Sequence, residues 1–101
     1  MNFYEYECIG DEELAVAASA VGFALTGLAE RPPDLAHCQN RDAQISVRVS
    51  GSNPTSIRGT FINENEIFEI TGAKDIKAFK AIRTGLTSGK IEATFFRRIT
   101  K

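Results

Sequence analysis

Alternating apolar and polar positions predict strands along much of the chain. Residues 3–9 place Tyr4, Tyr6 and Cys8 between acidic residues, the period-two pattern of a strand with one dry face, and Cys8 is expected to be a core thiol. The same alternation runs through residues 45–50 and 90–99. Residues 57–62 and 66–71 are rich in Ile, Phe and Thr and are separated by three residues. We expect those two strands to pair as an antiparallel hairpin.

A long uncharged stretch predicts a buried helix near the start. Residues 14–29 carry no charge and consist largely of helix-forming residues. Asp11 can cap the N-terminus of such a helix, and Pro32 and Pro33 prevent its continuation. The expected helix therefore spans about residues 11–31. Because it has no charged side, it is expected to be covered all round.

A second helix is predicted from Lys74 to Gly85 or to residues 87–89. Apolar residues recur there at spacings of three and four, with basic residues between them: Ile76, Phe79, Ile82 and Leu86. Residues 34–43 show no clean period and are compatible with either a single helical turn or an irregular loop.

These elements predict a single α+β domain over residues 1–101. Their order is β-α-β-β-β-α-β, with a mostly antiparallel sheet and both helices on one face. A chain of 101 residues supports one core. With 43% hydrophobic and 25% charged residues, the composition excludes a disordered or fibrous chain.

Small residues on the expected first helix suggest self-association. Helical spacing aligns Ala15, Ser19, Gly22 and Thr26 in one uncharged stripe. Such a stripe allows another backbone to approach closely, either the second helix of the same chain or the first helix of a second copy. We expect a homo-oligomer, a dimer or larger, with these four residues at its interface.

Charge is divided between the two parts of the chain. Residues 1–40 hold seven acids and one base, a net charge of −6, and residues 41–101 hold eleven bases and six acids, a net charge of +5. The basic residues near the C-terminus are candidates for binding an anion: Lys77, Lys80, Arg83, Arg97 and Arg98. Lysines on the outer face of an amphipathic helix are most commonly just solvated, and a pI of about 5.8 without a recognisable motif argues against nucleic acid.

Chemistry-bearing residues are few. His37 is the single histidine and adjoins Cys38, but adjacent side chains on a strand or helix point apart, which makes a poor nucleophile–base pair. One His with two Cys lacks the paired spacings of a zinc site. We therefore predict no catalytic residue, metal or cofactor, and two reduced cysteines.

The apolar run also bears on location and membranes. Residues 14–29 are shorter than the roughly 18–20 residues needed for a membrane span. The acidic N-terminal residues lack the pattern of a secretory signal. These observations predict a cytoplasmic protein without a membrane segment.

Three function classes follow. The first is a non-catalytic, homo-oligomeric binding module that recognises a protein or small ligand through the outer face of the sheet or a cleft between subunits. The second is a binder of nucleic acid or another anionic partner through residues 74–101. The third is an enzyme whose site assembles between subunits, with Cys8, His37 and Cys38 as candidates.

Overall fold

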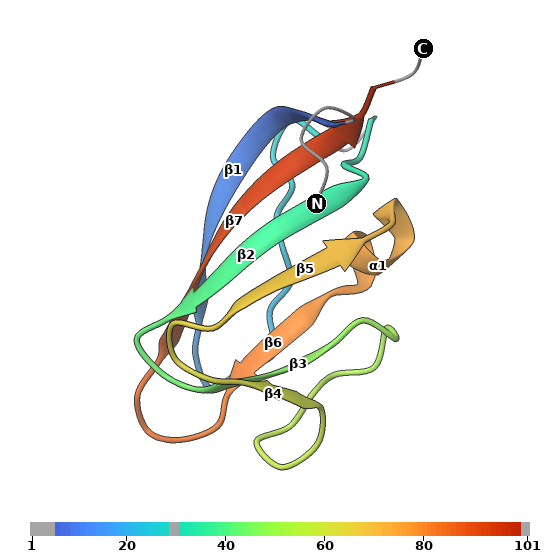
Figure 1. The fold of residues 1–101 in the computed structure, drawn as a ribbon. Coiled ribbons are helices and arrows are strands. Elements are labelled where there is room, and N and C mark those ends of the chain that lie inside the picture. The colour runs from blue at the N-terminus through green and yellow to red at the C-terminus, as the bar shows by residue number, and fades with distance from the viewer. Residues whose placement is uncertain (1–5, 29–30, 100–101) are drawn as a thin grey trace.

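The computed structural model describes residues 6–28 and 31–99, which form two antiparallel sheets (Figure 1). The larger sheet contains, in spatial order, β1 (Tyr6–Val16), β7 (Gly89–Arg98), β2 (Leu35–Arg41) and β5 (Ile67–Thr71). The smaller contains β4 (Thr60–Ile62), β3 (Ile45–Arg48) and β6 (Lys80–Arg83). Among the described residues α1 (Ala73–Ala78) is the one helix. The predicted α+β class with two helices is therefore wrong, because the protein is mostly β.

The expected first helix is replaced by a longer strand and a coil. Strand β1 continues to Val16, with Leu14 and Val16 buried and Asp11 and Glu13 exposed. Asp11 caps no helix, because it lies opposite Thr94 in the pairing of β1 with β7. Pairing along the whole of β7 has overridden the helix propensity of the Ala-rich segment.

Residues 17–28 form no helix but are anchored as coil. The Glu12 carboxylate accepts hydrogen bonds from the N–H groups of Ala24 (2.8 Å) and of the following residue (3.0 Å). The ring of Phe23 stacks on Phe79 with centroids 4.8 Å apart and meets Phe95 edge-on at 5.3 Å. The apolar character of this segment is thus satisfied by aromatic packing rather than by a helical stripe.

The second expected helix is also cut short. It ends at Ala78, because Phe79 adopts extended backbone angles (φ −57°, ψ 132°) and leads into β6. Residues 34–43, predicted to be a helical turn or a loop, contain β2, which lies between β5 and β7. The strands predicted over 45–50, 66–71 and 90–99 are confirmed to within a few residues, whereas the strand predicted over 57–62 is limited to β4.

Strands β4 and β5 follow one another in the chain but belong to different sheets, so the predicted hairpin is wrong. Asn40, at the end of β2, explains the divergence. Its carbonyl accepts the N–H of Asn65 (2.7 Å), and its own N–H donates to the carbonyl of Glu66 (3.0 Å). Its fully buried side-chain amide donates to the carbonyls of Ile62 (3.0 Å) and Asn63 (3.1 Å). The groups of the connecting turn are therefore bonded to β2.

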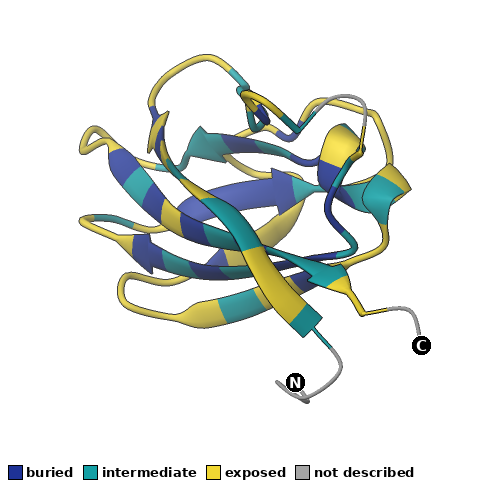
Figure 2. Ribbon diagram, turned by 90° about the horizontal axis from the view of Figure 1, so that it is seen from above, coloured by how far each residue is buried: buried dark blue, intermediate teal, exposed yellow. Residues whose placement is uncertain are grey.

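The core lies between the two sheets, and buried positions alternate with less buried ones along β2 and β7 (Figure 2). It is built from both sheets and from Phe79, and its fully buried large apolar side chains are Val16, Ile45, Ile76, Phe79, Ile91 and Phe95. The radius of gyration, 13.2 Å, is close to the value of about 13 Å for a domain of this size. No helix in the described part of the chain is long and apolar enough to cross a membrane.

Candidate functional site

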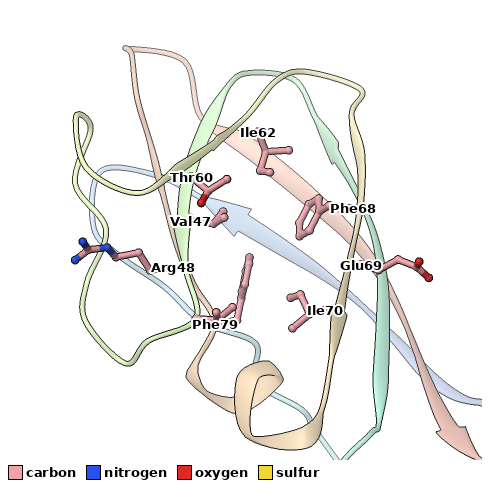
Figure 3. Close-up of a pocket in the computed structure, with 9 residues that line it drawn as sticks. Val47, Arg48, Thr60, Ile62, Phe68, Glu69, Ile70 and Phe79 are labelled. Carbon is pink, nitrogen blue, oxygen red and sulfur yellow. The ribbon is translucent and has the colours of Figure 1, made fainter. Parts of the chain in front are cut away.

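An apolar pocket of about 250 Å³ lies between the two sheets, where β4 and β5 diverge (Figure 3). Strands β3, β4 and β5 supply most of its walls. Its lining consists of Val47, Arg48, Val49, Thr60, Ile62, Phe68, Glu69, Ile70 and Phe79. Apolar side chains thus dominate the interior.

Strand periodicity directs these side chains into the pocket. Alternation along β5 turns Phe68 and Ile70 inward, and Val47 of β3 faces them from the other sheet (Figure 3). The Phe79 ring stands between them and is stacked on Phe68 with centroids 6.0 Å apart. A dry apolar cavity of about 150 Å³ can hold benzene. The pocket is therefore large enough for a small ring or one apolar side chain.

The pocket lining includes one basic and one acidic residue. Arg48 and Glu69 point away from its centre in opposite directions (Figure 3). Arg48 lies directly opposite Lys80 in the pairing of β3 with β6, and the Lys80 ammonium donates to the Asn53 side-chain oxygen at 3.1 Å. The segment around Arg48, residues 43–63, contains no acidic residue that could offset this charge. Two like charges side by side disfavour folding slightly and attract an anion.

The structure separates the basic residues that the sequence suggested. Lys77 is on α1, Lys80 and Arg83 are on β6, and Arg97 and Arg98 end β7 in the other sheet. The Arg97 guanidinium donates to a backbone carbonyl (3.0 Å), and the backbone N–H of Arg98 donates to a side-chain carboxylate (2.8 Å). Lys80 is the one of the five that lies beside the pocket residue Arg48. Sequence analysis missed Arg48 because its neighbour across the sheet cannot be identified without the strand register.

The four residues expected at an oligomer interface do not share a helix. Ala15 is exposed on β1, and Ser19 and Thr26 are exposed in the 17–28 segment. Gly22 packs within the chain, where an added Cβ would lie 2.6 Å from the Phe79 carbonyl oxygen. The helical stripe that motivated the homo-oligomer is therefore absent, and the homo-oligomer itself stays a prediction.

The cysteines and the histidine occupy different surroundings. Cys8 is exposed, so the expectation of a core thiol is wrong, whereas Cys38 is buried. Burial, and to a lesser extent the nearby Glu69 carboxylate, raises the pKa of Cys38 from 9.0 to about 12, which keeps it a neutral thiol. His37 lies between Thr94 and Glu69 across the strands. Within the described residues, no three His, Cys, Asp or Glu side chains are grouped to hold a metal ion.

Comparison with protein-family models, curated proteins and solved structures found no match for this chain.

Proposed function

We propose that the protein is a non-catalytic binding module whose pocket between the sheets receives an apolar group of a protein or small-molecule ligand. The observation that supports this is the 250 Å³ apolar hollow itself. Concave sites lined mainly by apolar side chains are the usual binding sites of small ligands. A ligand that covers the exposed parts of Phe68 and Val49 gains about 25 cal/mol for each Å² of apolar surface removed from water.

The polar groups of the pocket favour binding over catalysis. Glu69 and Arg48 point apart, and Thr60 supplies the one hydroxyl of the lining. A nucleophile in hydrogen-bond reach of a base is the usual signature of covalent catalysis, and the lining contains neither Cys nor His. The buried thiol of Cys38, with its raised pKa, is a poor nucleophile for the alternative enzyme hypothesis.

A direct test follows the methyl groups of the pocket by NMR during titration with phenol and with cyclohexanol. We expect the signals of Val47, Ile62 and Ile70 to shift in a saturable way, because these side chains line the pocket. Val47→Phe should fill the hollow and abolish the shifts.

Ile57→Phe adds the same ring at an exposed position outside the pocket lining and serves as the matched control. It should bind both probes like the wild type. Saturable shifts that persist in Val47→Phe, or no shifts in the wild type, would contradict the proposal.

Two further expectations remain proposals beside this one. A homo-oligomer is one, with a second copy or another protein as the ligand, and a cytoplasmic location is the other.

A further inference from the structure

Strand β5 presents an unpaired edge beside the pocket. Strand β2 bonds to one side of β5, and no other described strand bonds to its second side. The Gly72 N–H donates to the Asp34 carbonyl (2.8 Å) and continues the register of β5 with β2. Because backbone groups of an antiparallel strand alternate in direction, Phe68 and Ile70 bond to β2. The N–H and C=O groups of Ile67, Glu69 and Thr71 point away from it, and no described residue bonds to them.

The other three sheet edges carry features that oppose the addition of a strand. Strand β1 has four acids (Glu7, Asp11, Glu12 and Glu13) and a bulge between Cys8 and Gly10. Strand β6 is covered by Val21, which exchanges two backbone hydrogen bonds with Ala81 (3.0 and 2.8 Å). Strand β4 has three residues. Proteins commonly protect edges by charge, bulges, covering segments and short strands.

Of these protections, strand β5 has one charged residue, Glu69, and neither a bulge nor a covering segment among the described residues. It spans five residues without Pro, Lys or a bulge, and Ile67 is 59% exposed on its outer face. Unpaired donors and acceptors that alternate along a strand are matched by the backbone of another extended chain. The edge therefore selects an extended polypeptide rather than a compact small molecule.

The pocket lies next to β5 on the side of the strand that does not pair with β2. In a strand added to β5, every second side chain would point toward the space between the sheets, as Phe68 and Ile70 do. One such side chain fits the apolar hollow, and Arg48 with Lys80 favours a carboxylate near it. From these contacts we infer that the partner is an extended peptide segment that pairs with β5 and inserts one apolar side chain into the pocket. This inference rests on the proposed function and specifies its ligand.

Parallel selections from a phage-displayed library of random linear peptides test the inference. One selection uses the wild type and the other Glu69→Pro, which removes an outward N–H without removing a bond to β2. We expect a peptide family with an apolar residue at a fixed position that is enriched by the wild type alone. Glu69→Ala removes the same carboxylate but keeps the N–H, so it is the reference for the side chain's own contribution, and Glu69→Pro should bind that family about tenfold more weakly than Glu69→Ala. Enrichment of the same peptides by Glu69→Pro, or no enriched family, would overturn the inference.

A second measurement leaves the protein unchanged, in case Glu69→Pro does not fold. Selected peptides are synthesised with single N-methyl groups at successive amides. Methylation of alternate amides, those that face β5, should weaken binding by about tenfold, the effect of losing one good hydrogen bond. Equal effects at all amides, or none, would exclude strand addition.

Failure of the inference can be distinguished from failure of the proposed function. In one outcome, phenol or cyclohexanol binds and Val47→Phe abolishes the binding, but no peptide is sensitive to Glu69→Pro. That result would keep the pocket as a ligand site and reject the peptide as its ligand. A wild-type dimer that Glu69→Pro converts to monomer would also reject it, because β5 would then pair with a second copy.

Discussion

At the residue scale, Asn40 holds the turn at which β4 and β5 diverge, and the pocket lies at that divergence. Its side-chain amide also donates to the Ala43 carbonyl at 2.8 Å, so three backbone carbonyls depend on one nitrogen. Its side-chain oxygen is buried without a partner in the described structure. A lone Asn in a segment without clear periodicity gives no sign of this role in the sequence. The divergence of β4 and β5 was therefore not predictable.

Replacing Asn40 with Ala should lower the free energy of unfolding by about 2–3 kcal/mol, because buried carbonyls would lose their donor. Urea denaturation measures the change. Asn53→Ala, at an exposed position, should alter stability by less than about 1 kcal/mol. Equal stability of the Asn40 variant and the wild type would show that the turn is held by other contacts.

Cys38 predicts a loss of stability at alkaline pH. The folded protein keeps this thiol protonated up to a pKa of about 12, whereas the unfolded chain ionises it near 9.0. The unfolded state therefore binds fewer protons between these values, and the free energy of unfolding falls as pH rises from about 9 toward 12. Cys38→Ala should show a shallower fall over that window by denaturant titration. Parallel curves for the wild type and Cys38→Ala would refute the prediction.

At the element scale, strands with one polar face were predictable and the apolar segments were not. Alternation located β7 because its less buried positions, such as Lys90, Glu92 and Thr94, are polar. It located β3 as well, although the polar Ser46 of that strand is fully buried. The 11–31 segment was misread because uncharged Ala-rich sequence favours a helix locally. The sequence does contain a strand pattern at the start of this segment, because polar Asp11 and Glu13 alternate with the positions of apolar Leu14 and Val16. In the structure the first two are exposed and the last two are buried. Burial against β7 then outweighs propensity.

Gly22 provides a test of how the 17–28 coil is attached. Gly22→Ala should lower the free energy of unfolding by about 1–3 kcal/mol, because its Cβ would press on the Phe79 carbonyl oxygen. Gly85→Ala is the matched control, since nothing lies within 4 Å of its added Cβ. Thermal melts of the two variants measure the difference. If Gly22→Ala melts like Gly85→Ala, the coil does not pack there.

At the scale of the whole molecule, the smaller sheet is basic and the edge strand β1 of the larger sheet is acidic. Strands β3, β4 and β6 with the connection 49–59 carry Arg48, Arg58, Lys80 and Arg83 and no acid, whereas β1 carries four acids. The sequence showed an acidic first part and a basic second part, but not which strands adjoin. The pocket and the unpaired edge depend on sheet order, which periodicity does not determine. The candidate site therefore became visible only in the assembled fold.

Residue-resolved amide hydrogen exchange in the unliganded protein tests the unpaired edge of β5 most directly. We expect slow exchange at Phe68 and Ile70, whose N–H groups bond to β2, and fast exchange at Ile67, Glu69 and Thr71. Slow exchange at all five amides would contradict the account, because the edge would already be covered. Fast exchange at all five would contradict it as well, because β5 would not belong to the sheet.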